Sequence, residues 1–210
     1  MKSVAIGLTM AVTMATPALA NDTALIPYAG VLMGYDNVQT TSLGLKTSDA
    51  KLSYGIALGA DTVVMPRVRL GVEAEYMRSK TNNVLPIDAL NALNTGYRRD
   101  LSISVRAGYE VTPHLLAYIK AGYTNRRAIA SGLAAGTVAG VPTPIAFSYP
   151  RNLGGYRVAA GLEYGTKVKA RLEYRLSQYG ATGGSTDPLA PELSYKAKSQ
   201  QVVAGLLYGF

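Results

Sequence analysis

Hydrophobic and polar residues alternate along most of this chain, in stretches of about ten residues separated by turns. Between Val68 and Tyr76 every second residue is apolar, while Arg69, Glu73 and Glu75 lie between them. The same period of two covers residues 52–60, 101–109, 115–123, 156–164, 168–176 and 201–210. Side chains alternate in this way on a β-strand, whereas an amphipathic helix repeats every three or four residues. With a first strand near 27–36, whose faces are less clear, the pattern predicts eight strands.

The connections between these strands alternate in length. Short turns are predicted at 64–67, 111–114 and 165–167, and long stretches at 37–50, 79–97, 128–154 and 178–192. Three short and four long connections place both ends of the chain on the short-turn side. Outer-membrane barrels have this rhythm, with short periplasmic turns and longer external loops.

The last strand carries the strongest signal. Its apolar face ends in Leu206, Tyr208 and Phe210, and a soluble protein rarely leaves such an edge bare, because an unpaired edge invites aggregation. A closed barrel in a membrane has no edge, and its outer face contacts lipid. A soluble sandwich or a lipocalin-like barrel could also alternate. Long strands, a terminal aromatic residue and many charges on core-facing positions favour the membrane barrel.

Tyrosine is the main aromatic residue, with 15 copies against two phenylalanines and no tryptophan. On the predicted outer face these rings form two groups, as expected where aromatic residues lie at the two membrane interfaces. The group at the long connections is Tyr54, Tyr76, Tyr123, Tyr156 and Tyr174, and the group at the short turns is Tyr109, Tyr164, Tyr208 and Phe210.

The N-terminus has the features of a secretory signal peptide. Lys2 precedes a mostly apolar stretch, and Ala18-Leu19-Ala20 is a small-x-small cleavage site. We therefore expect a signal peptide at 1–20 and one domain at 21–210, exported to the bacterial outer membrane. The apolar stretch is too short to span a bilayer as a helix.

Taken together, the signal peptide, the alternating strands, the turn rhythm and the ending Gly205, Tyr208, Phe210 resemble the small outer-membrane barrels of the opacity-protein and outer-membrane-protein-A type, often labelled porin family. The resemblance is architectural and covers the predicted mature chain. It implies an all-β, closed, eight-stranded antiparallel up-and-down barrel that is monomeric. It also implies that Gly205, Tyr208 and Phe210 form a C-terminal signal for the barrel-assembly machinery of a Gram-negative cell.

The predicted inner face carries a set of charges that we call the lumen network. Its members are Arg69, Glu73, Glu75, Arg106, Glu110, Lys120, Arg157, Glu163, Lys169, Arg171, Glu173 and Arg175. An eight-stranded barrel is about wide enough for side chains to fill, and an unpaired buried charge is costly. We expect these charges to pair, with Glu73 and Glu75 next to Arg106 on the neighbouring strand. The alternative is a solute channel with a charged lining.

A second set of cations, the basic rim, lies where the strands meet the long connections. It comprises Arg78, Lys80, Arg98, Arg99, Arg126, Arg127, Arg151, Lys196 and Lys198. These residues either form a solvated border of the apolar band or contact the phosphates of lipopolysaccharide in the outer leaflet. Outer-membrane lipid is therefore a predicted partner.

No enzymatic, metal, cofactor or nucleic-acid site is predicted. The single histidine, His114, lies in a Thr-Pro-His turn without a recognisable serine partner, and cysteine is absent. The glycines lie in strands rather than before a helix, so a phosphate-binding loop is not expected.

The sequence thus predicts a barrel with a structural role in the envelope or in surface interaction. Two alternatives stay open: a narrow porin for small solutes, and an adhesin that acts through the long connections. The stretch 128–154 is rich in Ala, Gly, Val and Pro, poor in charge, and either mobile or an apolar contact surface for an unknown ligand.

The C-terminal signal gives a first prediction. Deleting Phe210, or replacing it with a charged residue, should leave export intact and impair insertion, because the assembly machinery is expected to bind the terminal aromatic residue. Heat-modifiable, membrane-embedded protein is the quantity to measure. Normal levels in the deletion variant would contradict the role assigned to Phe210.

Overall fold

The computed structural model describes residues 24–42, 45–79, 83–86, 92–138, 141–180 and 196–210. The predicted signal peptide, 1–20, lies outside this part of the chain. Within the described ranges, no helix has the length and apolar character needed to cross a membrane.

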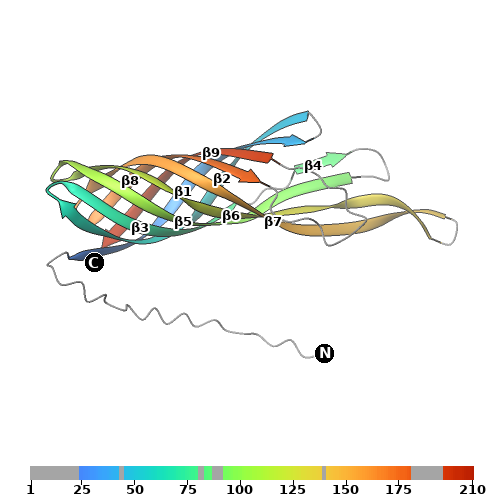
Figure 1. Cartoon of the computed structure of the whole chain (residues 1–210). Helices are drawn as coiled ribbons and strands as arrows, with labels where there is room; N and C mark the ends of the chain where they lie inside the picture. Colours follow the sequence, from blue (N-terminus) through green and yellow to red (C-terminus); the bar gives the residue numbers. More distant parts are fainter. Residues whose placement is uncertain (1–23, 43–44, 80–82, 87–91, 139–140, 181–195) are drawn as a thin grey trace, which may run out of the picture.

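The chain folds as a closed antiparallel β-barrel (Figure 1). Strand β1 pairs with β2 on one side and with β9 on the other, and β3 pairs with β5, so the sheet returns on itself. The strands are β1 Leu25–Ser42, β2 Leu45–Met65, β3 Val68–Ser79, β4 Asn83–Pro86, β5 Ala92–Thr112, β6 Leu115–Val138, β7 Val141–Gly165, β8 Val168–Gly180 and β9 Lys196–Gly209. The short β4 pairs with the part of β5 beyond β3, so the wall has eight strands, as predicted.

All three predicted short turns are two-residue turns at one end of the barrel. They are Pro66-Arg67, Pro113-His114 and Thr166-Lys167. Arg67 has a φ of 69°, and Gly165 before the third turn has a φ of 128°, which glycine adopts without steric cost. The C-terminus lies at this same end: the Phe210 amide donates to the Pro27 carbonyl at 3.0 Å.

Two of the four long connections are β-structure over most of their length. The β1–β2 pairing continues to Ser42 and Leu45, and the β6–β7 pairing continues without a break to Val138 and Val141. Figure 1 shows the β6–β7 hairpin reaching well past the barrel. The period of two is lost in these segments because beyond the membrane no single face must be apolar, although the backbone still pairs. The expected loop at 128–154 is therefore a β-ribbon.

Prolines border one edge of this ribbon, which we call its open edge because no described strand pairs with it. The described pairing of β7 with β8 stops at Gly154, and beyond it the only described partner of β7 is β6. The Gly165 amide donates to the carbonyl of His114, the residue before β6. The amides of odd-numbered β7 residues therefore point toward β6, and those of even-numbered residues point away from it. Pro142, Pro144 and Pro150 are all even-numbered. Their missing N–H groups therefore lie on the open edge, which cannot template a further strand.

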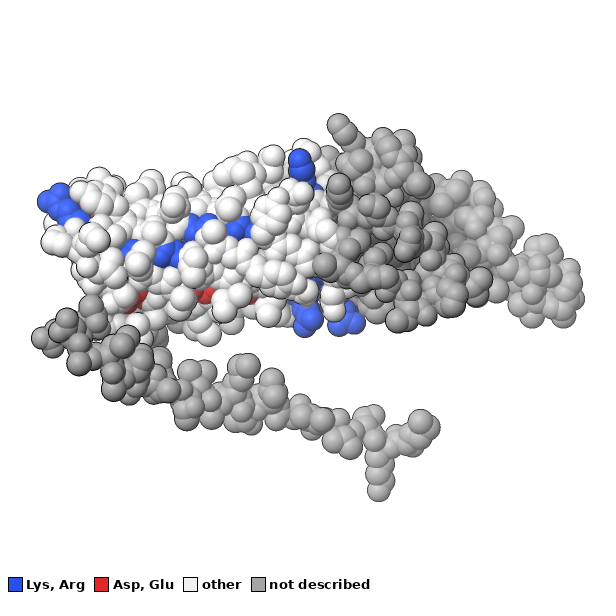
Figure 2. Space-filling model, in the orientation of Figure 1, with Lys and Arg blue, Asp and Glu red and all other residues white. Residues whose placement is uncertain are grey.

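The outer wall is an apolar band that fits lipid. Leu58, Val105, Ile119 and Leu206 are each more than half exposed, and they belong to a continuous surface far larger than water-soluble proteins tolerate. The outward tyrosines lie in two groups as predicted, all exposed except the partly covered Tyr76. Figure 2 shows the wall mostly white, with cations at both of its ends and a few blue and red atoms between them.

Candidate functional site

The inner wall of the barrel has an apolar side and a charged side. Strands β1, β2 and β9 contribute most of a small apolar cluster, in which Tyr28 and Leu32 pack against Val203 and Leu207. Strands β3 and β5 to β8 face them with acidic and basic side chains at alternate positions. The charged side is the candidate site, and its contacts form three layers along the barrel axis.

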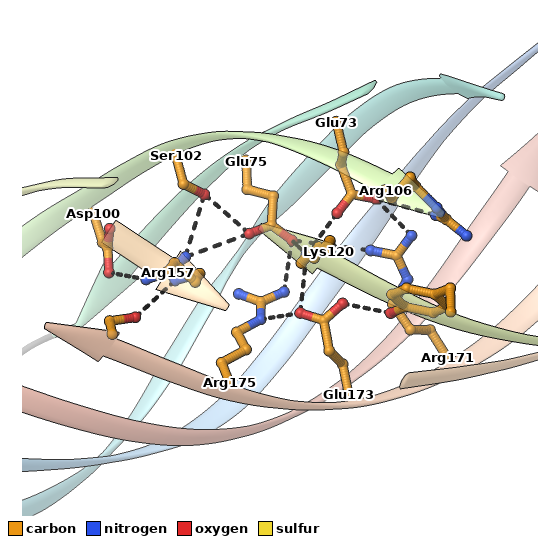
Figure 3. Close-up of polar contacts among 12 residues, drawn as sticks. Glu73, Glu75, Asp100, Ser102, Arg106, Lys120, Arg157, Arg171, Glu173 and Arg175 are labelled. Carbon is orange, nitrogen blue, oxygen red and sulfur yellow. Dashed lines mark hydrogen bonds and ion pairs between the residues drawn. The ribbon is translucent and has the colours of Figure 1, made fainter. Parts of the chain in front are cut away.

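The middle layer centres on the ammonium group of Lys120 (Figure 3). Its Nζ lies 2.7 Å from Glu73 and from Glu75 on β3, and 2.9 Å from Glu173 on β8. The three carboxylates lie close enough to one another to hold a metal ion. The ammonium occupies that position instead, and it supplies the three donors that an acidic cluster of this kind requires.

Arginines on β7 and β8 neutralise the rest of this acidic cluster. Arg171 bridges Glu73 at 2.6 Å and Glu163 at 2.7 Å. Arg175 lies 2.6 Å from Glu75 and also pairs with Glu173 on its own strand. Because each carboxylate has more than one cationic partner, the charges form a connected network rather than separate pairs.

The layer toward the long connections centres on Asp100. Its carboxylate accepts from Arg157 at 2.6 Å, from Arg126 at 2.8 Å and from the hydroxyl groups of Thr124 and Tyr179. Arg126 also lies 2.9 Å from Asp36 across the bore. Strand β1 is thereby tied to β5, β6 and β7 through the interior.

The layer toward the short turns centres on Arg106. Its Nη1 lies 2.9 Å from Glu163 and donates to the hydroxyl group of Tyr28 at 2.9 Å, while its Nε lies 3.4 Å from Asp61. The expected contact with Glu73 is longer, at 3.6 Å. No ion pair joins Arg106 to Glu75 in the described part of the barrel, since Glu75 is directed to Lys120, Arg157 and the β8 arginines.

Below this layer the barrel opens into a vestibule of about 300 Å³ at the turn end. Arg69 and Glu110 pair at its wall and are partly exposed, unlike the members of the layers above. The buried Lys169 also lines it, 3.8 Å from Glu163. His114 lies exposed in its turn at the mouth, where its backbone amide donates to the Thr112 hydroxyl group and its carbonyl accepts from the Gly165 amide.

The charges in the described ion pairs balance. The cations are Arg69, Arg106, Lys120, Arg126, Arg157, Lys169, Arg171 and Arg175, and the anions are Asp36, Asp61, Glu73, Glu75, Asp100, Glu110, Glu163 and Glu173. Because both signs are equal in number, these paired charges add no net charge to the interior. Their pairing avoids the penalty of an uncompensated buried charge.

All twelve predicted members of the lumen network lie on the inner wall. The structure adds Asp36, Asp61 and Asp100, which the sequence analysis missed. Asp61 and Asp100 each lie one residue outside a recognised alternating segment, so extending the period of two by one step would have found them. Asp36 lies on the strand whose faces were unclear. No sequence pattern indicated that tyrosine hydroxyl groups take part. Those of Tyr28, Tyr118 and Tyr179 donate to Glu73, Glu173 and Asp100, respectively.

The basic rim needs one correction. Arg126 was assigned to the outside, but it is buried and bonded to Asp100, because even-numbered residues of β6 face inward. Of the others, Arg78, Arg98, Arg99, Arg127 and Lys198 are exposed. Lys80 and the side chains of Arg151 and Lys196 lie outside the described residues.

The three residues of the C-terminal signal lie on both faces of β9. Tyr208 and Phe210 are exposed on the outer wall, with their rings packed edge to face at 5.3 Å. Gly205 faces inward, where an added methyl group would meet the Leu32 side chain at 2.6 Å, so a larger residue at this position would require that side chain to move.

Solved structures to which this chain is similar include Ail, the attachment invasion locus protein of Yersinia pestis, with 12% identity over 86% of this chain and 98% of that one, at a TM-score of 0.47. Neisserial surface protein A is 14% identical over 87% of this chain and 97% of that chain, with a TM-score of 0.47. The N-terminal β-barrel domain of Pseudomonas aeruginosa OprF is 12% identical over 85% of this chain and 97% of that chain, with a TM-score of 0.37.

No curated protein matches the sequence. A family model, described as outer membrane protein beta-barrel domain, matches residues 6–210, which is nearly the whole chain, and its description agrees with the closed wall and the lipid-fitting band. The chain therefore belongs to the outer membrane protein beta-barrel domain family, whose members lie in the bacterial outer membrane.

Proposed function

We propose that this protein is a closed structural barrel of the bacterial envelope, with neither a conducting pore nor a catalytic site. The observation that supports the proposal is the lumen network, in which charged side chains from the five strands β3, β5, β6, β7 and β8 meet across the bore. Arg157 and Arg175 are among the largest fully buried side chains of the described residues, and both lie in the path that a solute would take.

An ion that crossed this barrel would have to separate pairs in every layer. The middle layer alone joins Lys120 to three carboxylates at 2.9 Å or less, and the arginines around it share those carboxylates. Eight strands leave an interior about wide enough for side chains. The vestibule at the turn end is open to one side, but the Arg106 layer lies directly above it.

The absence of catalysis is proposed on similar grounds. His114 is exposed in a turn, and no described serine hydroxyl or carboxylate bonds to its ring. The buried acidic residues are already neutralised by cations. A general base must lie within reach of a substrate, and these carboxylates are held in ion pairs inside the barrel wall.

Conductance in planar bilayers tests the closed lumen. The wild-type protein should show no stable unit openings. A charge-balanced variant with Glu73→Ser, Arg171→Ser, Asp100→Ser and Arg157→Ser should open a path, because it removes bulk from two layers and keeps the interior neutral. The matched control, Arg69→Ser with Glu110→Ser, removes a pair at the vestibule and should stay silent. Stable openings of the wild-type protein would favour the narrow porin instead.

Stability gives a second test of the same network. Arg157→Met should lower the free energy of unfolding by about 3 kcal/mol, because it strands part of the charge of Asp100 and Glu75 in the interior. Arg69→Met removes a partly exposed pair and should cost less than about 1 kcal/mol. Urea unfolding in lipid vesicles measures both. Equal, small losses would mean that the interior is solvated like the vestibule and would count against a closed lumen.

A second candidate function is surface interaction through the β6–β7 hairpin. What favours it is the unbroken register to Val138 and Val141, which makes the hairpin a paired ribbon that extends past the barrel, with prolines on its open edge. A paired ribbon can present a contact surface at a lower ordering cost than a structureless loop. The partner would be a macromolecule at the cell surface.

Replacing residues 132–147 with a two-residue turn after the Ser131–Ser148 pair would remove the tip and keep the barrel. If the hairpin mediates contact, the shortened protein should insert normally, and cells that carry it should lose most adhesion to host cells or matrix. The parent protein, at equal surface level, is the control. Unchanged adhesion would rule out this role for the hairpin.

A further inference from the structure

Three outward arginines lie side by side on neighbouring strands at the end of the barrel that bears the long connections. The strand register pairs Arg78 of β3 with Arg99 of β5, and Arg99 in turn with Arg127 of β6. All three side chains are exposed. Directly opposed residues on adjacent strands have Cβ atoms about 5 Å apart, so we call these residues the arginine row.

A fourth arginine stands beside the row in a β-bulge. The register between β5 and β6 skips from Tyr97 to Arg99, which leaves Arg98 as the extra residue. A bulge lets consecutive side chains depart from strict alternation, and Arg98 and Arg99 are both exposed. The bulge therefore adds positive charge at the same level.

Such a row is unfavourable by itself. Like charges directly opposite each other on adjacent strands repel, and no described acidic side chain pairs with any member of the row. At the two ends of the row, the strand register pairs Arg78 with Tyr54 and Arg127 with Asn152, and both of these neighbours are uncharged. An arrangement that repels itself in isolation becomes favourable when an anion binds between the cations.

The depth of the row indicates which anion. Tyr76 and Leu101 lie opposite each other one outward position closer to the middle of the membrane band. The arginines thus follow directly upon the aromatic and apolar residues of the wall, which is the depth of lipid headgroups. Guanidinium groups bind phosphate oxygens through paired hydrogen bonds, and neighbouring cations reinforce one another at an anionic surface.

We propose that the arginine row is a binding site for the phosphate groups of lipopolysaccharide, on the β3–β5–β6 side of the barrel. The row faces outward from the wall rather than up from the hairpins, which favours a lipid headgroup over a soluble polyanion. The site is independent of whether the lumen conducts. It places the contact with lipopolysaccharide phosphates on one side of the barrel, at β3, β5 and β6.

The rest of the described outer wall supports that asymmetry and supplies a control. On the opposite side Lys198 is the exposed cation at the corresponding end, and its paired neighbours are Gln39 and Gln178. The substitution Lys198→Gln therefore removes one positive charge, as Arg99→Gln does, but it leaves the arginine row intact.

The test compares heat-unfolding midpoints of reconstituted protein in four environments: phosphatidylcholine alone, with diphosphorylated lipid A, with dephosphorylated lipid A, and with a soluble heparin fragment. Wild-type protein should gain stability only with the phosphorylated lipid. Arg78→Gln with Arg99→Gln and Arg127→Gln should lose that gain, and in phosphatidylcholine alone it should unfold at the same or a higher temperature than wild type, because the repulsion is relieved. Lys198→Gln should keep the gain.

A single change, Arg99→Gln, should weaken binding of the phosphorylated lipid about fivefold, since one cation near an anionic surface contributes that much. It serves as the second variant should the triple one fold poorly. The proposal is overturned if the row variants keep the lipid-dependent gain, or if they lose stability equally in all four environments. A gain from the heparin fragment as large as that from lipid would assign the row to a soluble polyanion and also overturn it.

Discussion

Backbone hydrogen bonding in a lipid phase is the constraint on which this structure depends. Within hydrocarbon no water can satisfy an amide or a carbonyl, so every strand must have two neighbours. The pairing of β1 with β9 meets that requirement, and the Phe210 amide bonded to Pro27 carries it to the last residue of the chain. Outside the membrane the same need is weaker, and there the open edge of the β6–β7 ribbon bears prolines and has no partner strand among the described residues.

Closure divides the side chains into two populations with different electrostatics. Inside, the charges of the described ion pairs occur in equal numbers of each sign, and arginines reach across the bore to carboxylates on distant strands. Outside, the exposed charged side chains that the structure describes are all cations: Arg67, Arg78, Arg98, Arg99, Arg127, Lys167 and Lys198. The net positive charge of the chain thus does not arise from these paired interior charges, and it is available to anionic headgroups.

The interior also explains how a narrow barrel can be uniquely packed with so few apolar core residues. Lys120, Glu73 and Glu173 each have several partners, so the position of one charge limits the positions of the others. Tyrosines also belong to the network. The Arg106 Cζ lies 4.2 Å from the centre of the Tyr118 ring, and its Nη1 donates to the hydroxyl group of Tyr28. A network of this kind is stable only when it is complete.

The sequence by itself determined the eight strands of the wall, the short turns and the side of the wall that most charges face, because a strand exposes alternate residues to opposite environments and lipid selects sharply between them. It failed where that selection is absent: beyond the membrane, where the ribbon at 128–154 shows no period of two, and at Arg126, whose place just past an alternating segment suggested the outside. Only the tertiary structure decided the partners. Arg106 pairs with its neighbour Glu73 as expected, at 3.6 Å, but it contacts Glu163 more closely, at 2.9 Å. Arg78, Arg99 and Arg127 form one row. Pairing across a bore and alignment around a wall depend on strand register and barrel closure, which relate residues far apart in the chain and leave no local pattern.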